Sequence, residues 1–126
     1  MIFGIGTDIV RVERMQQDLD RFGDKFAERI LTPAEMREFQ GNAHKAHFLA
    51  RRFAAKEAAA KAMGTGFSNG VHLRDIGVIH DPQGKPMLEF GGRAEQFIHE
   101  KCISVAHISL ADEQDHAVAF VTLETV

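Results

Sequence analysis

The chain has 126 residues, of which 44% are hydrophobic and 26% are charged. Those values are ordinary for one soluble globular domain with one core. The formal net charge of −3 argues against a protein that binds nucleic acid non-specifically through an excess of positive charge.

Cysteine content and hydropathy indicate where the protein works. Cys102 is the only cysteine, so no disulfide can form within the chain, and we expect a packed thiol in a reducing compartment. No apolar run approaches the ~20 residues of a membrane span. Asp8 and Arg11 interrupt the N-terminal apolar run too early for a signal peptide. We therefore expect a cytoplasmic protein with no membrane partner.

The first segment, Ile2 to Ile9, alternates with a period of two and predicts a strand. One face of that strand carries Ile2, Gly4, Gly6 and Asp8. Because glycine has no side chain, this face leaves room beside Asp8 for a ligand or for a neighbouring backbone. Asp8 itself has two interpretations: it caps the N-terminus of a following helix, or it is one of several oxygen ligands of a magnesium ion.

Helical patterns follow in the first half of the chain. Apolar residues predict a helix from Val12 to about Phe22. The next short apolar cluster consists of Phe26, Ile30 and Leu31. Thr32-Pro33-Ala34-Glu35 then combines a threonine cap, a proline and a glutamate that can complete a capping box, which predicts a helix to about Gln40.

Ala46 to Met63 predicts the longest helix, because it is rich in alanine and in straight side chains. Glu57 and Lys61 are four residues apart and share a face of that helix. They can form an exposed ion pair, or they can belong to a site for an anion and a metal. The flanking alanines favour the second interpretation because they let a large group approach. The turn that follows, Gly64-Thr65-Gly66, has backbone amides that can contact anionic oxygens.

The second half of the chain predicts paired strands. The predicted elements are strands 71–80 and 87–90 around a turn at 81–86, a helix at 93–101, and strands 104–110 and 117–123. Within the strand at 104–110, His107 is expected to be a core or edge histidine with one satisfied nitrogen. The whole pattern predicts an α+β fold in which an antiparallel sheet packs with a long central helix and shorter helices, as one domain over 1–126.

The first helix and its end carry basic side chains near one side. Arg14, Arg21 and Lys25 follow helical spacing there, with Asp18 on the same side. This surface can be an ordinary solvated face of mixed charge, or a local basic patch that docks an acidic partner.

Several motifs, in order along nearly the whole chain, resemble the holo-acyl-carrier-protein synthase family of short phosphopantetheinyl transferases. They are Gly-Ile-Gly-Thr-Asp-Ile-Val at 4–10, Phe-Ala-Glu-Arg-Ile-Leu-Thr at 26–32, Arg-Phe-Ala-Ala-Lys-Glu at 52–57, Gly-Lys-Pro at 84–86 and His-Ile-Ser at 107–109.

The resemblance implies a fold, a reaction and a set of catalytic residues. The family moves 4'-phosphopantetheine from coenzyme A to a serine of apo-acyl carrier protein and releases adenosine 3',5'-bisphosphate. By this resemblance Asp8 and Glu57 are catalytic ligands of Mg2+, and Lys61 is a catalytic contact to the diphosphate of coenzyme A. The general base stays open between Glu57, a water on the metal and a nearby carboxylate.

The resemblance also implies binding residues. The residues implied for coenzyme A are Arg52, Lys61, Gly64, Thr65, Gly66, Lys85 and His107. The residues implied for the acyl carrier protein are Arg14, Arg21 and Lys25, with Phe26 as an apolar anchor. Members of the family are commonly homotrimers with each site at a subunit interface, so the Gly84-Lys85-Pro86 turn could serve a neighbour's site.

Two other functions stay open at this point. The chain could be a non-catalytic module that binds acidic carrier proteins on the same fold. It could also be a magnesium-dependent nucleotide pyrophosphatase that hydrolyses coenzyme A without a carrier protein.

Overall fold

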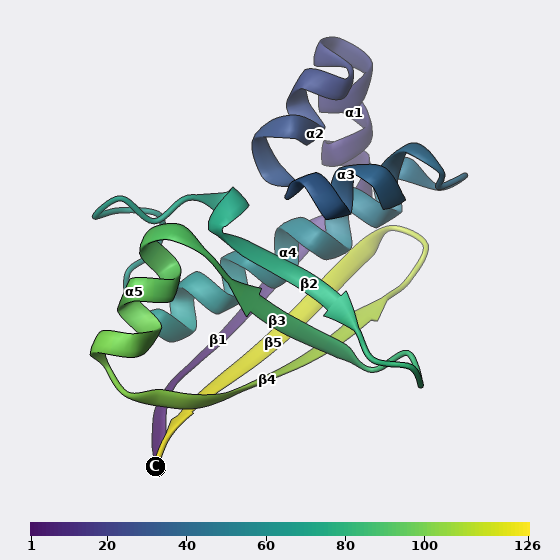
Figure 1. Ribbon diagram of the computed structural model, residues 1–126. Coiled ribbons are helices and arrows are strands. Elements are labelled where there is room, and N and C mark those ends of the chain that lie inside the picture. The colour runs from purple at the N-terminus through teal and green to yellow at the C-terminus, as the bar shows by residue number, and fades with distance from the viewer.

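A computed structural model describes residues 1–126, with five α-helices and two antiparallel sheets (Figure 1). The elements in chain order are β1 (Ile2–Arg11), α1 (Val12–Phe22), α2 (Asp24–Ile30), α3 (Pro33–Gln40), α4 (Lys45–Met63), the 3-10 helix η1 (Leu73–Asp75), β2 (Ile76–His80), β3 (Pro86–Phe90), α5 (Gly92–Glu100), β4 (Ile103–Asp112) and β5 (His116–Thr125). This arrangement confirms the predicted α+β fold.

The main sheet has the strand order β1-β5-β4, so the first strand of the chain pairs with the last. The long helix α4 packs across one face of this sheet (Figure 1). Alternate residues of the central strand form the buried side of that contact: Ala117, Ala119, Val121 and Leu123. No helix covers the opposite face, which carries residues such as Ile5 and Phe120.

Two glycines of β1 let the strand lie directly on α4. A β-carbon added to Gly4 would lie 1.9 Å from the carbonyl oxygen of Ala62, and one added to Gly6 would lie 2.0 Å from that of Ala58. Neither distance leaves room for a side chain. The space beside Asp8 is therefore filled by a neighbouring backbone, which is one of the two possibilities that the sequence left open.

The start of α3 forms as predicted. The hydroxyl oxygen of Thr32 accepts from the backbone N–H of Glu35, and the Glu35 carboxylate accepts from the backbone N–H of Thr32. Just before it, the apolar cluster around Phe26 lies in a helix of its own, α2, which the sequence analysis did not predict. Gly23, at φ 65°, ends α1 and lets the chain begin α2 at once.

Two sequence predictions are wrong. The strand predicted from Val71 begins only at Ile76, because residues 73–75 form η1, whose Asp75 carboxylate accepts from the backbone N–H of His72. Cys102 is exposed rather than packed. It follows α5 at φ 56°, in the left-handed turn that leads into β4, and this turn leaves its side chain outside the core.

No helix of the chain is both long enough and apolar enough to cross a membrane.

Candidate active site

Asp8 and Lys61 meet where β1 crosses α4. The Lys61 ammonium donates to the Asp8 carboxylate and to the carbonyl oxygen of Thr7, each at 3.0 Å. Asp8 does not cap α1, because the N-cap position is Arg11 and no side chain caps that helix. The helix-cap interpretation of Asp8 is therefore wrong. Since the ion pair of Lys61 is with Asp8, the simple Glu57–Lys61 pair is not formed either.

Glu57 is the second carboxylate of this group. Burial raises its pKa above the usual value near 4.5, and repulsion from Asp8 raises it further, while Lys61 and Arg14 partly oppose the rise. Burial and the neighbouring Asp8 both disfavour the negatively charged form of Glu57. A cation bound between Asp8 and Glu57 would stabilise both negative charges.

The donor set fits a hard divalent cation. Both carboxylates offer oxygen, which Mg2+ prefers, and the ion usually completes its shell with phosphate oxygens and water. No group of three or more His, Cys, Asp or Glu side chains could bind a metal by itself. The pair therefore suits a magnesium ion that arrives with a phosphate ligand better than a permanent structural metal.

The turn after α4 is used mainly to end the helix. Gly64 is left-handed at φ 80°, and its N–H donates to the carbonyl oxygens of Ala60 and Lys61. The N–H of Gly66 also donates to Ala60. These two amides are thus occupied, contrary to their expected availability for anionic oxygens. The Thr65 hydroxyl donates to the carbonyl oxygen of Gly66.

Two predicted coenzyme A residues lie away from this group. His107 is on the uncovered face of the sheet, with Nε2 3.5 Å from the Glu124 carboxylate. Lys85 is exposed in the β2–β3 turn. Figure 1 shows that turn and the segment between α4 and η1 at opposite ends of the molecule. Neither His107 nor Lys85 makes a hydrogen bond or an ion pair with Asp8 or Glu57 in one chain.

Arg52 also lies apart from the Asp8–Glu57–Lys61 group. Its side chain is only 7% exposed. It donates to the carboxylates of Glu35 and Glu38 and to the carbonyl oxygen of Val78. Its guanidinium carbon lies 4.4 Å from the centre of the Phe48 ring.

The predicted docking residues form one surface on α1 and α2. Arg14, Arg21 and Lys25 are exposed and take part in no ion pair. Arg14 lies over the ring of Phe53 at 5.5 Å, which places it one turn of α4 from Glu57. A hollow of about 200 Å3 beside Arg21 is lined by Asp18, Phe22, Lys25, Phe26 and Arg29. This surface thus joins free positive charge to a hollow lined by both apolar and charged side chains.

Comparison with models of known protein families identifies the family of this chain. The model of the 4'-phosphopantetheinyl transferase superfamily matches residues 4–121. The chain belongs to this superfamily. The family resemblance predicted from the motifs is confirmed.

Individual relatives match this chain along its whole length. The chain is 55% identical over 125 residues to a holo-[acyl-carrier-protein] synthase of Halorhodospira halophila, covering 99% of each chain. The crystal structure of such a synthase from Neisseria meningitidis has a TM-score of 0.94 and 46% identity, covering 99% of this chain and 100% of that one. A third, from Bacillus anthracis in complex with CoA (3',5'-ADP), has a TM-score of 0.83 and 39% identity over 100% of this chain and 99% of that one.

The sequence analysis missed one cluster, on a different face of α4 from the candidate site. Lys56 is fully buried and pairs with Glu35, which is 2% exposed. A signal was present, because Arg52 and Lys56 are four residues apart and therefore share a face of α4. That face differs from the one that carries Glu57 and Lys61.

Proposed function

We propose that this chain is a holo-acyl-carrier-protein synthase of fatty-acid biosynthesis. It transfers 4'-phosphopantetheine from coenzyme A to a serine of apo-acyl carrier protein and releases adenosine 3',5'-bisphosphate. The observation that carries the proposal is the Asp8–Glu57–Lys61 group, found in a chain that matches such synthases from end to end. A free, unpaired cysteine is compatible with the cytoplasm as its compartment.

The residues of the group divide the work. Asp8 and Glu57 hold Mg2+, which when bound supplies positive charge to the diphosphate of coenzyme A. Lys61, whose side chain is 52% exposed, would contact the diphosphate oxygens. The Gly64–Gly66 turn, three residues further along, forms a wall of the same pocket.

The transfer is a phosphoryl displacement. The serine oxygen forms a bond to the β-phosphorus of coenzyme A, and the bond from that phosphorus to the adenosine bisphosphate breaks. The serine proton passes to a base. The candidates for that base are Glu57, a water on the metal and a nearby carboxylate.

The functional unit is a homotrimer. The uncovered face of the main sheet exposes large apolar side chains: Ile5 at 60%, Ile9 at 64%, Val118 at 38% and Phe120 at 46%. They lie side by side, since Ile9 pairs with Val118 and Thr7 with Phe120 in the β1–β5 register. A contiguous apolar patch of this kind usually marks a protein interface.

Assembly explains the scattered site residues. His107 lies on this uncovered face and Lys85 on the distant hairpin turn, so neither reaches Asp8 and Glu57 of its own chain. In a trimer each can contact coenzyme A bound at a neighbouring subunit. The active sites are therefore shared between protomers.

The carrier protein docks on the α1–α2 surface. Arg14, Arg21 and Lys25 offer positive charge to an acidic partner, and Phe26 lines a recess for an apolar side chain. Arg14 also lies close enough to lower the pKa of Glu57, although burial and Asp8 together outweigh it. A carrier protein bound here is consequently delivered beside the catalytic group.

Mass spectrometry of apo-acyl carrier protein tests the proposal. Incubation with coenzyme A, Mg2+ and this protein should add ~340 Da to the carrier protein, as phosphopantetheine chemistry requires. Binding of the carrier without any mass gain would identify the non-catalytic module. Breakdown of coenzyme A in the absence of carrier protein would identify the pyrophosphatase.

A further inference from the structure

Strand β2 has one edge without a neighbouring strand. It pairs only with β3, in a two-stranded sheet separate from the main one. The backbone groups of Ile76 and Val78 that point away from β3 would be left without partners if nothing covered them. Both residues are buried, so water does not take that place.

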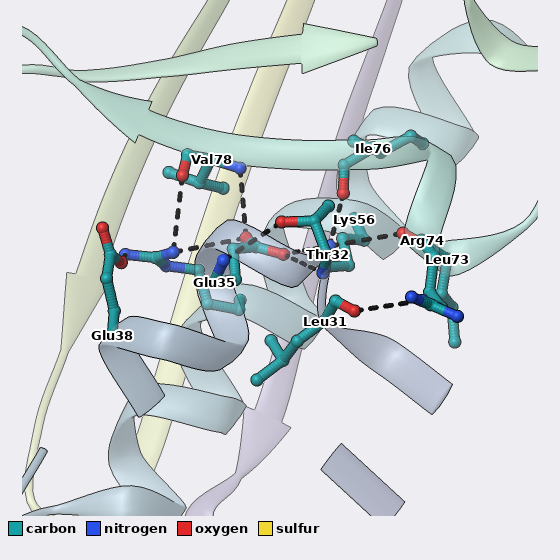
Figure 2. Close-up of polar contacts among 10 residues, drawn as sticks. Leu31, Thr32, Glu35, Glu38, Lys56, Leu73, Arg74, Ile76 and Val78 are labelled. Atoms are coloured by element: carbon teal, nitrogen blue, oxygen red, sulfur yellow. Dashed lines mark hydrogen bonds and ion pairs between the residues drawn. The ribbon is translucent and has the colours of Figure 1, made fainter. Parts of the chain in front are cut away.

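Charged side chains occupy this edge instead. The backbone N–H of Val78 donates to the Glu35 carboxylate at 3.1 Å, and Arg52 donates to the carbonyl oxygen of Val78 at 3.4 Å. The Lys56 ammonium donates to the carbonyl oxygen of Ile76. Figure 2 shows Glu35 and Lys56 reaching Val78 and Ile76 from below the strand. Three side chains thus make the hydrogen bonds that an adjacent strand would make.

Within this cluster the charges are paired and the buried hydrogen-bonding groups all have partners. Glu35 also accepts from Lys56 at 2.7 Å and from the backbone of Thr32 at 2.9 Å, while Arg52 donates to Glu38 at 2.9 Å. No buried side-chain polar atom lacks a partner. A buried charge network is stable only when it is this complete, and the loss of one member leaves the others unpaired.

The same contacts connect three elements. Glu35 belongs to α3, and Arg52 and Lys56 belong to α4, while the groups they bind belong to β2. Strand β2 in turn carries β3 and the turn with Lys85. The position of that turn relative to α4 therefore depends on whether the cluster is intact.

We propose that Glu35, Arg52 and Lys56 are positioning residues that replace a neighbouring strand along β2. They hold the β2–β3 hairpin in place, so that Lys85 at its turn can contact coenzyme A. The link to coenzyme A rests on the function proposed above, whereas the holding of the hairpin does not. Arg52 then acts through the hairpin, because its guanidinium is already bound on both sides and stacked on Phe48.

Amide hydrogen exchange of the intact protein, together with calorimetric binding of coenzyme A, tests this role. Arg52→Met should speed exchange of the Val78 amide about 10-fold or more, because local opening of β2 becomes easier. The Val121 amide, in the central strand β5, should exchange as in the wild type. The Kd for coenzyme A should rise about 5-fold. Arg52→Lys, which keeps the charge, should restore part of both losses.

Arg93→Met is the matched control, because it removes an ion pair of comparable length, to Glu100, outside the cluster. It should change neither the Val78 exchange rate nor the Kd for coenzyme A. If Arg52→Met unfolds the protein, the Val78 exchange rate and the Kd for coenzyme A are compared between Arg52→Lys and the wild type.

Two results would overturn the proposal. Weaker binding of coenzyme A with unchanged Val78 exchange would mean that Arg52 contacts coenzyme A directly. Faster Val78 exchange with unchanged coenzyme A binding would mean that the hairpin does not serve that site. A wild type that binds coenzyme A but forms no holo-carrier protein would contradict the proposed function instead, and the exchange and binding comparison would still decide this inference.

Discussion

At the scale of single residues, the half-buried Glu57 and the fully buried Glu35 have opposite surroundings. Glu57 lies beside another carboxylate, and its pKa is raised by burial and by Asp8. For Glu35, burial alone would raise the pKa, but the Lys56 ammonium and hydrogen bonds from Lys56, Thr32 and Val78 hold it below the usual value near 4.5. Glu35 is therefore arranged for stability. Glu57 is arranged at the expense of stability, which is typical of a carboxylate in a functional site.

Glu35 should give the protein a measurable dependence of stability on pH. A carboxyl whose folded pKa is lowered contributes stability above its unfolded pKa, near 4.5, and loses it as pH falls through the folded pKa. Glu35→Gln should cost roughly 3 kcal/mol at pH 7, because it leaves Lys56 and Arg52 without their common partner. Urea unfolding from pH 7 to pH 3 measures both effects. An unchanged slope below pH 4.5 in Glu35→Gln would contradict this role.

At the scale of elements, strand β1 lies directly on α4 at Gly4 and Gly6. Gly6→Ala should destabilise the protein by about 2 kcal/mol or more, because its β-carbon would meet the Ala58 carbonyl oxygen at 2.0 Å. Gly41→Ala is the control, since the nearest atom to its β-carbon would be 3.9 Å away. Thermal unfolding of both variants gives the comparison. Equal melting temperatures would mean that β1 can move off α4 without cost.

The helices and strands differ in how well the sequence predicted them. Local chemistry predicted α3 with its capping box and α4 to within one residue, because caps and periodicity act over a few residues. The same local reading failed at 71–75, where the Asp75 carboxylate accepts from the His72 backbone and closes the turn of η1. It could not show the edge of β2 either, because the partners of that edge lie on α3 and α4, far away in sequence.

The geometry of the candidate site could be predicted only in part from the sequence. The motifs suggested Asp8, Glu57 and Lys61, and the fold brings Asp8 and Lys61 into contact. No spacing in the sequence could show that Lys61 pairs with Asp8 rather than with Glu57, because that choice depends on how β1 crosses α4. The burial of Arg52 was hidden for a similar reason: its partners Glu35 and Val78 come from other elements.

At the scale of the whole molecule, the uncovered sheet face predicts the oligomeric state. Phe120→Glu should convert a homotrimer to a monomer, because it places a charge in the middle of the apolar patch. Sedimentation equilibrium at working concentration measures this change. A wild type that is monomeric and fully active would contradict the shared site.

Mixing two inactive variants checks the shared site further. Glu57→Gln and His107→Ala, combined after dissociation and reassembly, should recover activity in ~a quarter of the sites, the fraction in which both intact residues meet. No recovery in mixed trimers would mean that His107 and Glu57 serve a site within one chain, so that the active site is not shared between protomers.

Docking of an acidic carrier protein on a mildly acidic protein requires local positive charge. Arg21→Glu should raise the KM for carrier protein about 10-fold and weaken its dependence on salt, with little change in the KM for coenzyme A. Lys101→Glu makes the same charge change at an exposed position beyond α5, outside the docking surface, and should change neither KM. Equal behaviour of the two variants would move the docking surface away from α1.

The rate at which adenosine 3',5'-bisphosphate is released in the presence of apo-carrier protein tests the central claim most directly. The claim is that Asp8 and Glu57 act together at a magnesium-dependent transfer site. Asp8→Asn and Glu57→Gln keep the shape of each side chain and open no cavity, so both variants should fold and bind carrier protein like the wild type. Each should lower the rate ~100-fold or more, and removal of Mg2+ should do the same to the wild type. Release at the wild-type rate by Glu57→Gln would contradict the account.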